Sequence, residues 1–352
     1  MPYDWKTIFH DWLLRADVDY SQNTCIEAFD TVERMLGASW IDSFAKGARG
    51  LAVTIPLVEL GKTLASIEPI RRARLIIQRI MKDGSLGSAY SEAYAIAFFK
   101  SLGFGIAISP KLRVDGSIKT PDFAVLTDRT RVYAEVSRPE HSKDQSQLEH
   151  NLISIQDDLM KVIPEGTHAE IFFYKEPSIQ ETRLVVSSAR DSVGIGESER
   201  RIEGLAQIFV GPLETDRSTL PGGLHEKRPI LFVTGIKRRG SSMSKVAVGI
   251  PFTDQRAQRI FNRESKHFSR NSTNLLILDV SRVPGGINSW THLMSSRLQP
   301  KLNRRVGAVF MTQYAIGKRR MERHSRLLVH PSPYTAIPQK LLQIMQGSEG
   351  NK

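Results

Sequence analysis

Two acidic residues, Asp122 and Glu135, lie in a segment whose residue pattern predicts two antiparallel strands joined by a tight turn. If the turn is centred on Asp128 and Arg129, opposed residues have numbers that sum to 257, so Asp122 directly faces Glu135. Opposed side chains in such a pair lie roughly 4.5 to 5.5 Å apart at Cβ, where two like charges destabilise the sheet. A divalent cation would offset this repulsion, because carboxylate oxygens are ligands that Mg²⁺ and Mn²⁺ prefer.

Two other arrangements of this segment stay open at the level of sequence. One of the two carboxylates could point to solvent. Alternatively, a three-residue loop could shift the register by one residue, which would move the strand's side chains to the opposite face.

Glu92 adds a third carboxyl group from a different element. It is the only charged residue between Ser91 and Phe99, and it shares a helical face with Ile96 and Phe99. A helix that is apolar nearly all round is buried, and a buried acid needs a cation or hydrogen-bond donors. The alternative is that Glu92 lies in the first turn and only complements the helix dipole.

The elements that would position these acids follow in the order helix, three strands, helix, strand. The helix is expected at residues 90–102, before Gly103 and Gly105. The other elements are expected as strands at 106–109, 123–127 and 131–137, an amphipathic helix at 145–163 and a strand at 170–174.

The acidic residues and their surroundings resemble the signature of the PD-(D/E)XK nuclease superfamily. In that signature a helix with an acidic residue precedes Pro-Asp, and Glu-x-Lys follows on the next strand. The matching residues here are Glu92, Pro121-Asp122 and Glu135-Val136-Ser137. The resemblance covers residues 85–174, about a quarter of the chain, and the order of elements agrees with it.

This resemblance implies a restriction-endonuclease-like αβββαβ core and a metal-dependent nuclease. Glu92, Asp122 and Glu135 would bind Mg²⁺ or Mn²⁺, with the backbone carbonyl of Val136 as a further ligand. The expected reaction is hydrolysis of phosphodiester bonds, with DNA rather than RNA as substrate, in restriction, defence or repair. A homodimer would be needed for simultaneous cleavage of both strands by single sites.

Ser137 departs from the family pattern, because it stands where the family's lysine is usual. That lysine is thought to position or activate the attacking water and to balance charge at the phosphate. Lys119, Arg138 or Lys143 could take its place. A catalytically inactive core that binds nucleic acid or regulates is the second hypothesis, and a scaffold that binds no nucleic acid is the third.

We expect an α/β protein with four regions along the chain. They are a helical N-terminal region at 1–84, the nuclease-like core at 85–175, a linker or insertion at 176–229 and a basic α/β region at 230–352. Within the first region, the spacing of apolar residues over 55–80 predicts two helices with a break near Pro69. Gly61, Lys62 and Thr63 match the end of a phosphate-binding loop, but Pro56 occupies the position of its first glycine.

The net charge of +12 is unevenly distributed. Residues 1–150 contain 19 basic and 19 acidic residues, whereas residues 225–330 contain 21 and 5. Such an asymmetry favours a polyanion partner bound through residues 225–330. The alternative is a generally basic surface that keeps the protein in solution.

The sequence also bounds the location of the protein. Hydrophobic residues make up 40% of the chain, and no window reaches the roughly 18 consecutive apolar residues of a membrane span. The N-terminal residues lack the separate basic and apolar regions of a secretory signal. Cys25 is the only cysteine, which excludes an internal disulfide. We therefore expect a cytoplasmic protein without a membrane partner.

Overall fold

The computed structural model of the chain describes residues 18–45, 51–83, 87–127, 130–139, 143–193, 195, 198–213, 230–239, 242–251, 256–283, 286–316 and 319–348. The chain divides into two compact units. The first comprises Met1–Pro139, Arg256–Ser281 and Met294–Lys352, and the second comprises Glu140–Gln255 and Arg282–Leu293. Most of the second unit is therefore inserted into the sequence of the first.

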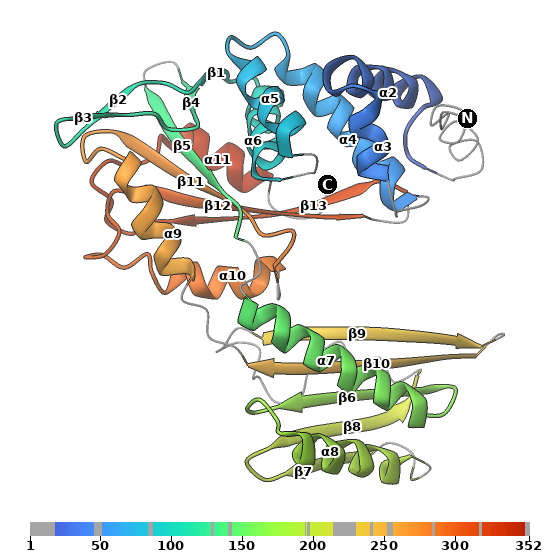
Figure 1. The fold of residues 1–352 in the computed structure, drawn as a ribbon. Helices are drawn as coiled ribbons and strands as arrows, with labels where there is room; N and C mark the ends of the chain where they lie inside the picture. The colour runs from blue at the N-terminus through green and yellow to red at the C-terminus, as the bar shows by residue number, and fades with distance from the viewer. Residues whose placement is uncertain are drawn as a thin grey trace. The chain divides into compact units, whose positions relative to one another are not determined.

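The first unit is built on a mixed sheet (Figure 1). Among the described residues it has six strands in the order β1-β4-β5-β11-β12-β13. The strands are β1 (Gly105–Ile108), β4 (Phe123–Leu126), β5 (Arg131–Ser137), β11 (Thr273–Asp279), β12 (Ala308–Ile316) and β13 (Met321–Val329). Strand β11 is parallel to both β5 and β12, and the other pairings are antiparallel. The nearly continuous apolar run of β11 suits this central position.

Helices cover both faces of this sheet. Figure 1 shows the N-terminal helices on one side and α9 (Arg256–Glu264) on the other. Helix α9 continues into a 3₁₀ turn, η2 (Ser265–His267). The N-terminal helices are α2 (Gln22–Leu36), α3 (Ala38–Ala45), α4 (Leu51–Ile67), α5 (Ala73–Asp83) and α6 (Ser88–Ser101), and their apolar cluster includes residues of α11 (Gln339–Gly347). The predicted helical N-terminus and the break at Pro69 are thus confirmed within the described residues.

Gly61 has a packing role in the first unit. It lies within α4, where a Cβ atom would be 2.2 Å from the backbone oxygen of Ala28 in α2. Only a residue without a side chain allows the two helices to approach this closely. Helix packing therefore explains Gly61, and the match of residues 61–63 to a phosphate-binding loop is accidental.

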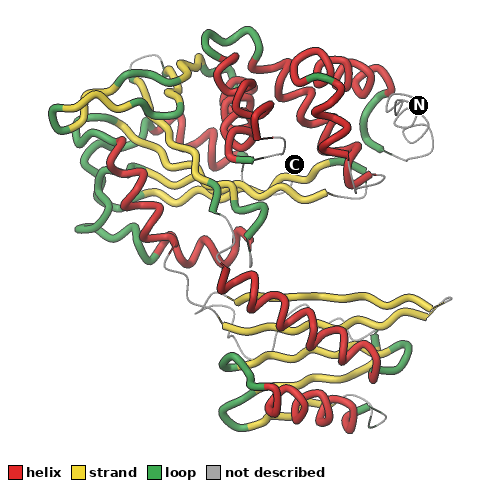
Figure 2. The backbone as a smooth tube through the Cα atoms, viewed as in Figure 1, coloured by secondary structure: helices red, strands yellow, loops and turns green. Residues whose placement is uncertain are grey.

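The second unit has its own sheet and its own apolar cluster. Its described strands follow the order β7-β8-β6-β10-β9. They are β6 (Thr167–Phe173), β7 (Ser198–Ile202), β8 (Ala206–Pro212), β9 (Ile230–Arg239) and β10 (Ser242–Pro251). Helices α7 (Lys143–Val162) and α8 (Ile179–Ser192) pack on this sheet (Figure 2). Helix α10 (Gly286–Ser295) crosses the boundary at Leu293.

The sheet order corrects the expected core at residues 85–175. The predicted helix at 145–163 and strand at 170–174 form, as α7 and β6, but they belong to the second unit. Helix α7 buries Leu152, Ile155 and Leu159 in the apolar cluster of the second sheet. Local periodicity predicts the type of an element correctly while containing no information about which sheet it joins. The neighbour of β5 is β11 instead.

The two later regions also differ from the sequence-based boundaries. Residues 176–229, expected as a linker or insertion, contain α8, β7 and β8, and residues 214–229 lie outside the described part. The expected basic region at 230–352 is divided between both units. The α/β class is confirmed. No helix in the described ranges has the length and apolar character needed to cross a bilayer.

The contact at Gly61 gives a test of the helical packing. We expect Gly61→Ala to destabilise the protein by about 1 to 3 kcal/mol, because the added methyl group forces α4 away from the backbone of α2. Urea unfolding measures this loss. The exposed Ala65 of the same helix is the control, since Ala65→Ser should change stability by less than about 0.5 kcal/mol. Equal stability of Gly61→Ala and the wild type would contradict the packing.

Candidate metal centre

The register of strands β4 and β5 brings Asp122 and Glu135 together. Phe123 pairs with Ala134, so opposed residues sum to 257 as predicted, and the shifted register is excluded. Asp122 and Glu135 share a side-chain hydrogen bond. The backbone N–H of Val136 donates to Asp122 Oδ2 at 2.8 Å. Neither acid is directed to open solvent, because Glu135 is 4% exposed and Asp122 is half-buried.

Glu92, on helix α6, interacts electrostatically with both Asp122 and Glu135. This helix has buried residues around most of its circumference, so Glu92 is only 3% exposed. Its Oε2 accepts a hydrogen bond from Arg79 at 2.5 Å, whereas its buried Oε1 has no partner among the described residues. Glu92 is the fifth residue of the helix, beyond the first turn. The explanation of Glu92 as a simple complement of the helix dipole therefore fails.

The three acids lie in an environment that raises the pKa of each of them. Burial, followed by the charge of Asp122, raises the pKa of Glu92 to about 8. Burial, the charge of Asp122 and the charge of Glu264 raise the pKa of Glu135 to about 10. Burial also raises the pKa of Asp122, while the hydrogen bond from Val136 opposes this shift. In the absence of a cation, Glu135 donates the proton of the hydrogen bond that it shares with Asp122.

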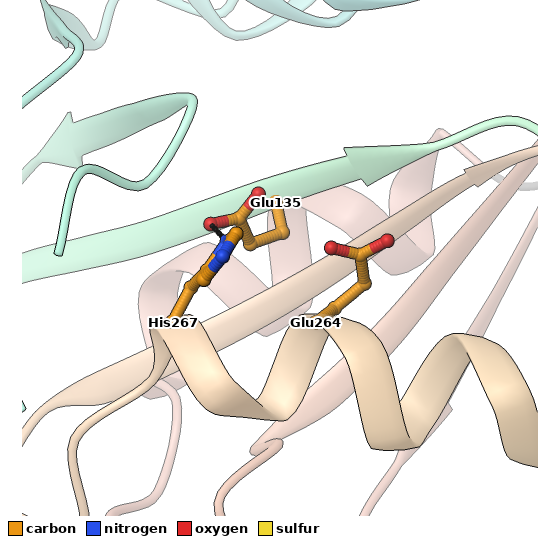
Figure 3. A group of neighbouring side chains, drawn as sticks. All are labelled: Glu135, Glu264 and His267. Carbon is orange, nitrogen blue, oxygen red and sulfur yellow. Dashed lines mark hydrogen bonds and ion pairs between the residues drawn. The ribbon is translucent and has the colours of Figure 1, made fainter.

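Two further residues join Glu135 from the opposite side of the sheet to α6. Figure 3 shows Glu264 at the end of α9 and His267 in η2, with the His267 ring turned towards Glu135. His267 Nδ1 lies 2.7 Å from Glu135 Oε1, and Glu264 is 6% exposed. One ligand atom from each residue of this trio lies within 4.8 Å of the others. The trio could hold a metal ion.

Sequence reasoning missed Glu264 and His267. They follow Glu135 by more than 120 residues, because the second unit intervenes. A histidine that lies three residues after an acid is a common spacing and no strong motif. The one available signal was the apolar sequence of β11, which is typical of a buried parallel strand at the centre of a sheet. Such a strand lies beside β5, and α9, which precedes it in the chain, therefore packs on the same sheet.

Ser137 is buried, and it is hydrogen-bonded to a cation that the sequence did not identify. Arg263 Nη2 donates to Ser137 Oγ at 2.7 Å. The same guanidinium forms an ion pair with Glu264 at 2.6 Å. A positive group therefore lies beside Ser137, at the position where the family pattern has lysine.

No described side-chain contact places any of the three basic residues proposed from sequence at this position. The side chain of Arg138 is 7% exposed, and its Nη1 donates to the carbonyl of Gly87 at 3.0 Å. Lys119 ends the strand β3 (Ser117–Lys119), which pairs with β2 (Leu112–Val114) in a separate hairpin. Lys143 begins α7 in the second unit, and its side chain lies outside the described residues.

Asp279, at the end of β11, holds helix α6 against the sheet. It accepts hydrogen bonds from the hydroxyls of Ser91 and Ser281, and from the backbone N–H of Ser281 at 3.0 Å. Arg138 Nε lies 3.9 Å from its carboxylate. Because Ser91 immediately precedes Glu92, this network positions Glu92 relative to β5.

Three runs of basic residues lie between residues 225 and 330, at 237–239, 304–305 and 318–320. The side chains of these runs that the structure describes contact other residues of the first unit. Arg305 pairs with Asp115 at 2.7 Å, and the guanidinium of Arg304 lies 4.5 Å from the ring centre of Tyr334. Arg319 and Arg320 both approach Asp19. Lys318 and the side chains of Lys237, Arg238 and Arg239 lie outside the described residues.

Comparisons of the chain with protein-family models, with curated proteins and with solved structures find no match.

The raised pKa values predict how stability depends on pH without metal. The pKa values of Glu92, about 8, and Glu135, about 10, lie above the unfolded value of about 4.3 for glutamate. The folded state therefore binds more protons than the unfolded state from about pH 5 to 8. The stabilisation is fully present below about pH 4 and is lost as the pH rises, by at most ~1.4 kcal/mol per pH unit for each proton.

Urea unfolding in a chelator-containing buffer between pH 5 and 9 measures this loss. Glu92→Gln should flatten the decline, because the amide does not titrate. Glu203→Gln removes an exposed acid of the second unit and should leave the slope unchanged. A slope that is the same in wild type and Glu92→Gln would contradict the assigned protonation.

Proposed function

We propose that the protein is a metal-dependent nuclease that hydrolyses phosphodiester bonds, with DNA as the expected substrate. The observation that carries this proposal is the group of buried acids around Glu135. Asp122 shares a hydrogen bond with Glu135, and Glu92 interacts electrostatically with both. Among the described residues, the ligand atoms that gather within 4.8 Å of one another are those of Glu135, Glu264 and His267, without Glu92 and Asp122. Acids placed in this way repel one another when ionised, and a divalent cation removes the repulsion.

The donor set fits such a cation. Glu92, Asp122 and Glu135 offer the hard oxygen ligands that Mg²⁺ and Mn²⁺ favour, and the unpartnered Oε1 of Glu92 has unused acceptor capacity. Glu264 and His267 extend the set on the other side of Glu135. When bound, a divalent cation polarises a phosphoryl oxygen and lowers the pKa of a coordinated water.

Each residue of the proposed site has its own role. Asp122 and Glu135 would hold the cation, Glu92 would contribute directly or through water, and the carbonyl of Val136 would be a further ligand by resemblance. Arg263, fixed by Ser137 and Glu264, places a guanidinium where charge develops on the phosphate. Ser137 therefore acts as a positioning residue.

We further propose that the first unit is a restriction-endonuclease-like core interrupted by the second unit. Helix α6 and strands β1, β4 and β5 correspond to the first part of the αβββαβ order, and α9 and β11 supply the last helix and strand. The parallel pairing of β5 with β11 supports this assignment, because it requires a crossover connection. The buried, unpaired Cys25 accords with a cytoplasmic location.

The second candidate function is a catalytically inactive protein that binds nucleic acid. The observation that favours it is Ser137, which replaces the family's lysine and is 2% exposed. Such a protein would retain the acids without a group that activates water.

Cleavage of nucleic acid tests the first candidate against the second. With Mg²⁺ or Mn²⁺, we expect the wild type to cleave plasmid or linear DNA, and Asp122→Asn to lose at least about 100-fold in rate because a ligand charge is removed. Gel electrophoresis of the products over time measures the rate, with structured RNA as a second substrate.

Asp157→Asn is the matched control, since it makes the same change at an exposed residue of α7. Cleavage that disappears with a chelator and with Asp122→Asn but persists in Asp157→Asn supports the nuclease. Binding of DNA without cleavage in any metal would support the inactive alternative.

His267 predicts a difference between metals. Imidazole is a better ligand for Mn²⁺ than for Mg²⁺, which prefers oxygen. We therefore expect His267→Ala to weaken Mn²⁺ binding by about tenfold and Mg²⁺ binding much less, as measured by isothermal titration calorimetry. His324→Ala, in β13, is the control histidine. Equal losses for both metals would remove His267 from the proposed ligand set.

A further inference from the structure

A large cleft opens in the first unit, lined in part by the first residues of strand β5. Its volume is about 1510 Å³, above the roughly 300 to 1,000 Å³ of small-molecule pockets. Tyr133 lines it, and Tyr133 lies two residues before Glu135 on the same face of β5. Two residues of a strand span about 7 Å. Residues 269–273, which also line the cleft, follow His267 almost directly. None of the proposed metal ligands lines the cleft, but its lining comes within two residues of Glu135 along β5 and within two residues of His267 along the chain.

The charge of this cleft is strongly positive. Its basic lining residues are Arg113, Arg131, Arg270 and Lys340, and its one acidic lining residue is Asp115. Asp115 is neutralised by the ion pair with Arg305 at 2.7 Å. Arg113 and Arg131 are exposed, and neither forms an ion pair with a described residue. The cleft thus presents guanidinium groups that form no ion pair with the acidic side chains that the structure describes.

The other lining residues are suited to bases. Phe104 and Tyr133 are half-buried aromatic side chains in the lining, and Leu112, Leu126 and Ile344 add apolar surface. A double helix presents phosphates outward and keeps its bases stacked inside, so it would leave apolar surface without a partner. An unpaired strand presents both phosphates and bases, and aromatic side chains between cations are the usual platform for it.

We infer that this cleft binds a single-stranded segment of nucleic acid, with phosphates against Arg113 and Arg131 and bases against Phe104 and Tyr133. The inference rests on the proposed function for its substrate class. It places the binding surface mainly outside residues 225–330, because among the four cations only Arg270 belongs to that range. The charge tally along the chain could not show this, since residues 1–150 are neutral overall.

Fluorescence anisotropy of a labelled single-stranded oligonucleotide in a metal-free buffer tests the inference separately from catalysis. The double variant Arg113→Glu with Arg131→Glu should bind at least about tenfold more weakly than wild type. Its slope of log affinity against log salt should decrease by about 1.4, at ~0.7 for each lost phosphate contact on a single strand. Unlabelled single strand should compete better than duplex of the same sequence.

The matched control is Arg71→Glu with Arg74→Glu, which reverses two exposed charges of the first unit that do not line the cleft. Circular dichroism and thermal unfolding establish that both double variants are folded. Equal weakening in the two double variants, full binding by the cleft variant, better competition by duplex or no binding by wild type would each overturn the inference.

The same variants distinguish this inference from the proposed nuclease. If Asp122→Asn abolishes cleavage while the cleft variant binds normally, the nuclease stands and the cleft assignment fails. If the cleft variant alone loses binding and no metal supports cleavage, the cleft assignment stands and the nuclease fails.

Discussion

The mutual repulsion of buried carboxyl groups is the constraint on which the first unit depends. Glu92, Asp122, Glu135 and Glu264 interact with one another in a region with little access to water. Two unit charges 4 Å apart cost about 4 kcal/mol at an effective dielectric constant of 20. Four ionised acids would therefore consume much of the roughly 5 to 15 kcal/mol by which a protein is stable. Protons, cationic side chains or metal ions must reduce this charge.

The basic side chains that meet these acids in the described part of the chain lie towards solvent. Those of Arg79, Arg263 and His267 are 49%, 64% and 41% exposed, whereas their acidic partners are 4% to 7% exposed. The buried side of the cluster retains acceptor capacity that these cations do not use, as the Oε1 of Glu92 shows. The exposed basic groups therefore leave this buried acceptor of Glu92 without a partner among the described residues.

The sequence predicted the parts of this site that are local. An even-length turn and strand alternation predicted that Asp122 faces Glu135, and the register of β4 and β5 selects this arrangement over the shifted register that the sequence left open. The apolar surroundings of Glu92 likewise indicated burial. The pairing of β5 with β11 could not be derived, because α7 and β6 have equally good helical and strand patterns and come first in the chain. Arg263 and His267 were missed for the same reason.

The insertion of the second unit has a consequence for synthesis of the chain. Asp122 and Glu135 leave the ribosome about 130 residues before His267. At about 5 to 20 residues per second, this interval lasts on the order of 7 to 26 seconds. During this interval β5 has β4 on one side but lacks β11 on the other. The acidic cluster also lacks Arg263, Glu264 and His267. The nascent chain therefore holds Glu92, Asp122 and Glu135 without Glu264 and His267 while the inserted unit is free to fold first.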